Sequence, residues 1–466
     1  MLTRGRQLIG RAGHLLWYTR RSIGEPCAVD RTRKGYQSLA DEIDRLLHEN
    51  LLTVWYPHSL DETYGGYHQR LSWSWPENGA TNKFLVCQAR LTWTAAAAAG
   101  YIREFRDRYL AYALHGLKFL DKVMRDEKFG GFHWRLDRSG RLTDKFGDDK
   151  HVYGIAFVVY AAAEIFRQTK NDRDLQVAVD AYEWLEHYAA DRQDGGYFEW
   201  LRRDGSYIPP PHSASRDKRL YTLETLVGYK SMNTHLHLLE AYALLYEIWP
   251  DKDLRNRLEH LLYIVRDRIA VAPGALNLYF TPDWRAVPAH DSFGHDVEAA
   301  FLLTEAVKTL GRAEDAVTWK LARQLVDHAL VWGWDEKFGG FYNKGEAFLS
   351  AHDTRKFGWV QAEGLNALLL MHERFIDENG PYFKAFTKQW GFIRNFQIDH
   401  RHGGWHTVLT REGKIASGRE PNETGSIYHY VRAMVNATRA LRHLCQSENG
   451  ASRNSGANRA CERIYN

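Results

Sequence analysis

A Gly-Gly-aromatic tripeptide recurs along this chain at a nearly constant interval. It occurs at Gly65-Gly66-Tyr67, Gly130-Gly131-Phe132, Gly195-Gly196-Tyr197, Gly339-Gly340-Phe341 and Gly403-Gly404-Trp405. Successive copies are 65, 65, 144 and 64 residues apart, and a degenerate copy, Gly274-Ala275-Leu276, lies near the middle of the long interval. The chain therefore divides into six similar units, and this periodicity decides the architecture.

Each unit has the pattern of a glycine turn followed by two helices. Apolar residues follow helical spacing over residues 109–123, 153–166 and 175–188. Glycine suits the turn because it accepts a positive φ, and the aromatic residue can plug the turn against the helices. Six helix hairpins can close into a ring with one helix of each pair inside and the other outside. We predict an all-α fold, an (α/α)6 barrel, over residues 36–446; an open solenoid that binds a protein or peptide is the alternative.

The two ends of the chain differ from the body in composition. Residues 1–35 form a basic N-terminal extension, which carries more positive charge than the whole chain's formal +4. Residues 447–466 are polar and rich in turn-forming types, which predicts a disordered tail. The body between them is slightly acidic, so we do not expect a nucleic-acid-binding protein.

Several classes of protein and site are disfavoured by the absence of their patterns. The four cysteines show no Cys-x-x-Cys spacing, which argues against structural zinc and disulfides. No apolar run reaches 18 residues, and the first 25 residues lack the apolar core of a secretory signal. Nucleotide-binding glycine motifs and the Gly-x-Ser-x-Gly motif are also missing. We expect a cytoplasmic monomer or homodimer without metal, cofactor or membrane association.

Two residue types are unusually frequent and indicate a kind of ligand. The chain has 16 Trp and 22 His residues, well above ordinary usage. Tryptophan-rich clefts suit sugar rings, whose C–H faces stack on aromatic planes. A small sugar is therefore the expected partner.

Polar residues interrupt the apolar pattern at one phase of successive units. They are Arg90, Tyr153, His237, His295 with Glu298, Glu363 and His429. Buried polar groups are costly unless they have partners or face a cavity, so we expect these side chains to converge at one end of the ring. A single histidine of this kind is more often structural, but three at the same repeat phase favour a site. His235 points away from His237 on a helix, so we expect it to pack.

This set of residues suits proton transfer at a carbon next to a carbonyl. Two imidazoles on opposite sides of one carbon can remove a proton from one face and return it to the other, which is epimerisation. Arg90 can stabilise the enolate oxygen, helped by His237 or Tyr153. Glu298, three residues after His295, can orient that imidazole. Such chemistry requires no metal and no cofactor.

At these motifs the chain resembles the N-acylglucosamine 2-epimerase superfamily, most closely its cellobiose 2-epimerases. The resemblance runs from about Tyr36 to about Leu441 and is carried by Gln88-Ala-Arg90, Asn233-Thr-His-Leu-His-Leu-Leu-Glu-Ala241, Ser292-Phe-Gly-His-Asp-Val-Glu-Ala299, Trp359-Val-Gln-Ala-Glu363 and Tyr428-His429. It implies an (α/α)6 barrel, opening of a sugar to its linear aldose, and proton exchange at C2 through a cis-enediol.

The resemblance also implies a role for each matching residue. His295 and His429 are the two acid/base residues, and Glu298 supports His295. Arg90 stabilises the enediolate, and His237 assists ring opening and carbonyl polarisation. The sugar site is lined by Tyr153, Asn233 and Trp359, and we also expect Glu363 there.

The chain departs from cellobiose 2-epimerases at two places and leaves the substrate open. It has Thr424-Gly-Ser-Ile427 where those enzymes usually have Trp-Lys-x-Pro, and Gly358 where they have a first tryptophan before Trp359. Both changes remove stacking area, so the substrate can be mannose or glucose as well as cellobiose. The alternatives are an aldose-ketose isomerase, a glycoside hydrolase using Glu298 and Glu363, and a non-catalytic sugar-binding scaffold.

Overall fold

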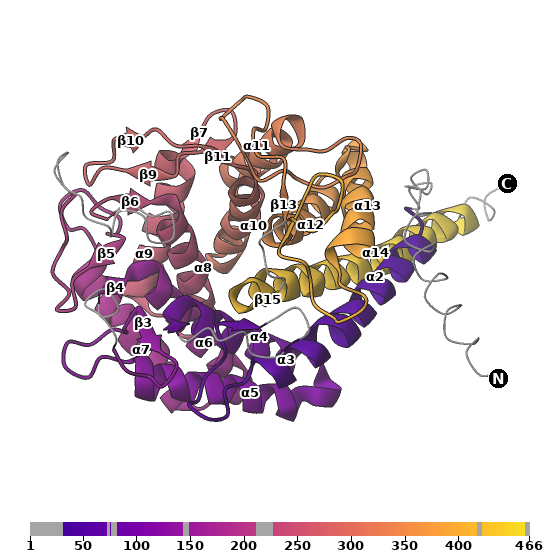
Figure 1. Cartoon of the computed structure of the whole chain (residues 1–466). Coiled ribbons are helices and arrows are strands. Elements are labelled where there is room, and N and C mark those ends of the chain that lie inside the picture. The colour runs from indigo at the N-terminus through magenta and orange to yellow at the C-terminus, as the bar shows by residue number, and fades with distance from the viewer. Residues whose placement is uncertain are drawn as a thin grey trace, which may run out of the picture.

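The fold is known from a computed structural model (Figure 1), which describes residues 31–71, 75, 82–142, 149–210, 227–416 and 422–461, the last range without the side chains of 422–424 and 447–461. The basic extension up to residue 30 lies outside the described residues. Within the described ranges, no helix combines the length and apolar character needed to cross a membrane.

Six inner helices form a closed ring. They are α4 (Leu85–Tyr101), α6 (Val152–Thr169), α8 (Met232–Ile248), α10 (Phe293–Thr309), α12 (Gly358–Arg374) and α14 (Ile427–Cys461). Each packs against the next, and α14 packs against α4. These helices are buried on nearly every side, as in α6, where every residue from Val152 to Ile165 is buried. Closure confirms the predicted barrel and excludes the open solenoid.

An outer helix covers each inner one. The outer set is α2 (Arg33–Leu46), α5 (Arg106–Phe119), α7 (Asp172–Trp184), α9 (Lys252–Tyr263), α11 (Ala316–Trp332) and α13 (Tyr382–Phe392), and α2 pairs with α14 from the other end of the chain. Short helical turns extend or link these helices: η1 (Leu47–Leu52), α3 (Thr53–Ser59), η2 (Arg103–Phe105), η3 (Leu120–Met124), η4 (Leu185–Ala189), η6 (Ile264–Ile269), η7 (Ile376–Glu378) and η8 (Ile393–Gln397), with η9 (Thr424–Ser426) before α14.

Short antiparallel strands join neighbouring units where the inner helices begin. The pairs are β1 (Arg70–Leu71) with β15 (Asn422–Glu423), β2 (Asn82–Phe84) with β3 (Arg135–Asp137), β4 (Lys150–His151) with β5 (Trp200–Leu201), β11 (Asp291–Ser292) with β12 (Lys344–Gly345), and β13 (Lys356–Phe357) with β14 (Val408–Leu409). In the third and fourth units β9 (Tyr279–Phe280) lies between β6 (Lys230–Ser231) and β10 (Ala286–Val287), and β7 (Ala270–Val271) pairs with β8 (Ala275–Leu276).

The glycine turns have the conformation that the sequence predicts. Gly66 has a φ of +66°, and a Cβ there would lie 2.5 Å from the side-chain oxygen of Gln88. That oxygen instead accepts the N–H of Tyr67, the aromatic residue that follows the turn. The turn is thus fixed to the first part of the next inner helix.

A buried ion pair accompanies the turn in four of the units. An aspartate just before the turn binds a lysine two residues before the inner helix, with N–O distances of 2.7–2.9 Å: Asp61–Lys83, Asp126–Lys150, Asp191–Lys230 and Asp335–Lys356. Each lysine side chain is at most 2% exposed. These pairs connect the turns to the ring.

The last helix extends into the region for which the sequence predicts a tail. α14 continues to Cys461, and no proline interrupts it. The boundaries of the basic extension, the barrel and the tail remain predictions.

Candidate active site

The predicted site residues lie in the first turns of the inner helices. Arg90 is the sixth residue of α4, Tyr153 the second of α6, His295 the third of α10 and His429 the third of α14. Because all six inner helices begin at the same end of the ring, these positions bring the side chains together. The convergence that the sequence predicts is therefore present.

Arg90, Tyr153 and His237 form one side of the site. Nη2 of Arg90 donates to the hydroxyl of Tyr153 at 2.6 Å, and the guanidinium lies over the rings of Phe157 and Tyr428 at 4.4 and 4.9 Å. The rings of Tyr153 and His237 are 5.2 Å apart. Aromatic faces attract the guanidinium and hold it in place without neutralising its charge.

A network that the sequence analysis missed stands behind His237. Nδ1 of His237 is 2.9 Å from Oε2 of Glu240, and Glu240 also binds Arg432 and accepts the hydroxyl proton of Tyr428 at 2.6 Å. Burial alone would raise the pKa of Glu240, but the charge of Arg432 and the hydrogen bonds of His237 and Tyr428 together outweigh it and lower that pKa to about 2. Glu240 therefore stays ionised and orients His237.

His429 is held by carboxylates on two neighbouring helices. Nδ1 of His429 is 2.6 Å from Oε1 of Glu363 and 3.7 Å from Oε1 of Glu298. Nη2 of Arg432 binds the same two oxygens at 2.7 and 2.8 Å. A hydrogen bond at Nδ1 leaves Nε2 of His429 to act on a substrate. Glu363, which we expected to bind sugar, lies fully buried behind His429 instead.

His295 has a different partner from the one predicted. Its Nδ1 lies 2.7 Å from the hydroxyl of Ser292, and its ring centre is 4.9 Å from that of Trp359. Glu298, expected to orient His295, binds Arg432 and approaches His429. The reason is electrostatic: a buried carboxylate lies against a buried guanidinium on α14 rather than a neutral imidazole on its own helix. His429 contacts the same indole as His295, with ring centres 5.5 Å apart.

A cavity of about 720 Å³ opens beside these residues. Of the predicted site residues, Asn233, His295 and Trp359 line it. The rest of its wall consists of Met232, Leu278, Tyr279, His290, Ser292, Asn343, Lys344, His352, Asp353, Arg355 and Phe357. This size and mixture of aromatic and polar side chains is typical of a site for a small polar ligand.

Both acid/base candidates are neutral imidazoles at neutral pH. Burial, opposed by the charge of Glu298 and helped by the nearby His237 and His429, lowers the pKa of His295 to about 4. Burial and the charge of Arg90 lower the pKa of His429 well below its usual range, while Glu298 opposes the shift. A neutral imidazole in a water-poor site is able to accept a proton from carbon.

Two outcomes concern residues outside the predicted set. His235 packs as expected, since its Nε2 accepts the N–H of Tyr197. Arg432 was missed although it follows His429 by three residues, and Glu240 follows His237 by the same interval. The i, i+3 spacing is the signal that would have found them.

Comparisons with known proteins agree with the geometry. Residues 66–433 match the sequence profile of the N-acylglucosamine 2-epimerase family. A cellobiose 2-epimerase of Bacteroides fragilis is 28% identical over 389 residues, which cover 83% of this chain and 94% of that protein. A D-mannose isomerase of Marinomonas mediterranea is 23% identical over 410 residues, or 84% of this chain and 95% of that one. The solved structure of the Spirochaeta thermophila cellobiose 2-epimerase superposes with a TM-score of 0.77 at 29% identity, covering 88% of this chain and 98% of that one.

Proposed function

Because the chain belongs to the N-acylglucosamine 2-epimerase family, we propose that it is a sugar 2-epimerase. It interconverts the C2 epimers of an aldose, a glucose or mannose unit that is free or at the reducing end of a β-1,4-disaccharide such as cellobiose. The observation that carries this proposal is the position of two imidazoles, His295 and His429, against the same indole of Trp359.

The proposed reaction moves one proton off C2 and one proton back on. One imidazole takes the C2 proton of the open-chain sugar, and the electron pair moves through C1 to the carbonyl oxygen, giving a cis-enediolate. The other imidazole, protonated, gives its proton to the opposite face of C2, and the carbonyl reforms. Both imidazoles are neutral in the free site because burial lowers the pKa of each, so the proton delivered to C2 must first be taken up from solvent. Glu363 and Glu298, beside His429, stabilise an imidazolium there once it forms, whereas His295 lies beside a neutral serine.

The remaining residues stabilise charge and hold the sugar. Arg90 is a permanent cation held between aromatic rings, which suits the developing enediolate oxygen. His237, oriented by Glu240, is placed to polarise the carbonyl or assist ring opening. Asn233 and Trp359 line the cavity, and Tyr153 holds Arg90.

An aldose-ketose isomerase is the second candidate. D-Mannose isomerases are among the relatives over most of the chain, and the same enediol protonated at C1 gives a ketose. Glycoside hydrolysis is less well supported, because Glu298 and Glu363 bind one nitrogen of Arg432 and so do not flank a glycosidic bond. We also propose a cytoplasmic monomer or homodimer.

Hydrogen exchange in D2O tests the two-imidazole proposal. Glucose, mannose and cellobiose are incubated with the protein, and NMR follows deuterium at C2 and the appearance of the C2 epimer. His295→Asn and His429→Asn should each abolish epimerisation, yet each should still exchange the C2 hydrogen of one epimer, and not the same one. Fructose as the sole product from mannose would select the isomerase. Absence of exchange with all three sugars, or unchanged conversion by both variants, would overturn the proposal.

A further inference from the structure

The fourth unit lacks the buried Asp–Lys pair found in four others. Asp291 stands two residues before α10, where those units have lysine before their inner helices. In those four units the aspartate directly follows a residue that forms a β-bridge with the aromatic residue of the glycine turn. The equivalent bridge of the fourth unit joins Ala270 to Leu276. The next residue, Val271, occupies the position of the aspartate. In the fourth unit valine therefore takes the place of the aspartate, and an acid takes the place of the lysine.

Asp296 stands at a position that has a recurring role in three of the inner helices. It is the fourth residue of α10; the fourth residues of α6 and α14 are Ile155 and Tyr430, whereas those of α4, α8 and α12 are Gln88, His235 and Gln361. Those three side chains accept a backbone N–H from the glycine turn of their unit. In the fourth unit the turn between β7 and β8 is shorter, and the residue at the equivalent position of the inner helix is Asp296.

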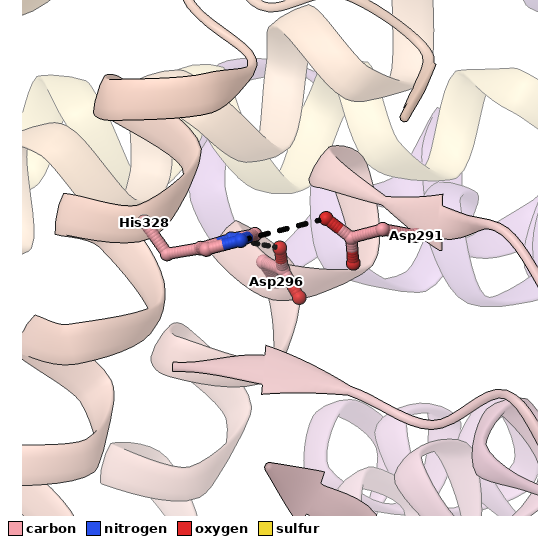
Figure 2. Close-up of side chains that lie close together, drawn as sticks. All are labelled: Asp291, Asp296 and His328. Atoms are coloured by element: carbon pink, nitrogen blue, oxygen red, sulfur yellow. Dashed lines mark hydrogen bonds and ion pairs between the residues drawn. The ribbon is translucent and has the colours of Figure 1, made fainter. Parts of the chain in front are cut away.

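Both carboxyl groups face one imidazole (Figure 2). Nδ1 of His328, on α11, is 3.1 Å from Oδ2 of Asp296, and its Nε2 is 3.8 Å from Oδ2 of Asp291. Relative exposures are 2% for Asp291, 0% for Asp296 and 5% for His328. One donor atom from each residue lies within 4.8 Å of the other two.

The cluster has unused oxygens and no permanent positive charge. Both carboxyl oxygens of Asp291 and Oδ1 of Asp296 are buried without a hydrogen-bond partner. Among the described residues, the ion pairs of both aspartates are with His328 alone. Buried charges in proteins are paired or bind a metal ion. The similar group Glu298, Glu363 and His429 differs because Arg432 supplies its cation.

We propose that Asp291, Asp296 and His328 bind one divalent metal ion of the Zn²⁺ or Mn²⁺ class. Two carboxylates and an imidazole form an oxygen- and nitrogen-rich donor set that such ions accept, with water completing the shell. One ion binds only one nitrogen of the imidazole, and donors at about 2.1 Å from it stand roughly 3–4 Å apart. One donor atom from each of the three residues now lies within 4.8 Å of the other two, so the cluster must contract to enclose an ion. This inference is independent of the proposed reaction.

Metal binding has one identifiable cost. Nε2 of His328 accepts the N–H of Phe348 at 3.2 Å, so the imidazole carries its proton on Nδ1. An ion at either nitrogen changes that arrangement, because it takes Nε2 directly or moves the proton there. The Phe348 amide must then turn away, and it belongs to a surface turn in which Leu349 is 58% exposed.

The ion would fasten together three elements close to the active site. Asp291 belongs to β11, Asp296 to α10 and His328 to α11. Ser292, the neighbour of Asp291, is the partner of His295. The ion is therefore structural: it fixes the start of α10 and thereby the orientation of His295. Cysteine spacing gives no signal for this site, because its donors are two aspartates and a histidine spread over 38 residues.

Metal content of the whole protein tests this proposal without relying on catalysis. Protein stripped with a chelator is dialysed against low micromolar Zn²⁺ or Mn²⁺, metal is measured by mass spectrometry, and thermal unfolding is followed with and without the ion. We expect about one ion per chain and a higher unfolding midpoint with metal. Asp291→Asn and His328→Gln should each weaken binding at least about tenfold and abolish the metal-dependent shift.

His429→Gln is the matched control, because it alters the other group of three potential ligands. It should keep both the ion and the midpoint shift. Stripped wild-type protein that takes up no ion, or an ion that Asp291→Asn and His328→Gln retain, would overturn the proposal. Loss of the ion in His429→Gln alone would place the metal at Glu298, Glu363 and His429, and this result would also overturn the proposal.

Discussion

Replacing Glu363 with glutamine removes one negative charge from behind His429 and keeps the side-chain volume. Oε1 of Glu363 is 2.6 Å from Nδ1 of His429 and 2.7 Å from Nη2 of Arg432, and the side chain is fully buried. When His429 carries a proton, this carboxylate stabilises the imidazolium. The glutamine oxygen still accepts a hydrogen bond, but it no longer balances the positive charge. Arg432 retains its ion pairs with Glu240 and Glu298 in this variant, so we expect the barrel to remain folded.

The size of the effect follows from the type of hydrogen bond. A hydrogen bond to a charged group contributes about 1.5–3 kcal/mol. If most of this is lost when the proton is on His429, kcat falls about 10- to 100-fold, at about 1.4 kcal/mol per tenfold. KM should change little, because Glu363 does not line the cavity.

The assay is the initial rate of C2 hydrogen exchange in D2O, measured by NMR over a range of sugar concentrations and pH. A structural defect alone would lower kcat without shifting its pH dependence. Loss of the carboxylate lowers the pKa of His429, so the limb of the kcat–pH profile that depends on protonated His429 should move to lower pH. Glu314→Gln is the control, since that carboxylate is 76% exposed and pairs with Arg374 at the surface. An unchanged kcat in Glu363→Gln, or an equal fall in Glu314→Gln, would refute the reasoning.

Four further predictions concern pH and stability. Because burial lowers the pKa of His295 to about 4, the acid limb of kcat/KM should lie well below pH 6.5; a limb near 6.5 would contradict this. The unfolded chain binds a proton at this imidazole below about pH 6.5 and the folded chain only near pH 4, so urea denaturation should show stability falling as pH drops through that window. Gly66→Ala forces alanine to a φ of +66° and a 2.5 Å contact, which should cost about 1–3 kcal/mol in thermal unfolding, whereas Gly391→Ala, with open space around its Cβ, should not destabilise. Lys356→Met removes the buried partner of Asp335 at 2.9 Å and leaves that carboxylate with the half-exposed Arg411 alone, which should cost about 1–3 kcal/mol in urea denaturation; no loss of stability would count against it.

The architecture could be predicted because it follows from a repeat that is visible in the sequence. Glycine turns recur about every 65 residues, and their side-chain requirements are local, as Gly66 and Gln88 illustrate. Convergence of the site followed from the same periodicity, since equal positions on equivalent helices meet at one end of a ring.

The pairing of side chains across helices could not be predicted in the same way. Helical spacing correctly places Glu298 on the same face as His295, but the choice between His295 and Arg432 depends on the relative position of α10 and α14. Glu363 was assigned to the sugar site for the same reason: the sequence does not show that its carboxylate binds His429 and Arg432. Distances between elements, not local propensities, decide these roles.

The helix that closes the ring also carries two residues of the site. α14 holds His429 and Arg432, packs against α4, and pairs with α2. The five other inner helices precede it in the sequence, so a chain that stops before residue 427 lacks both the helix that joins α12 to α4 and the imidazole and guanidinium on it. Closing the ring and completing the proposed proton-transfer site therefore depend on the same helix.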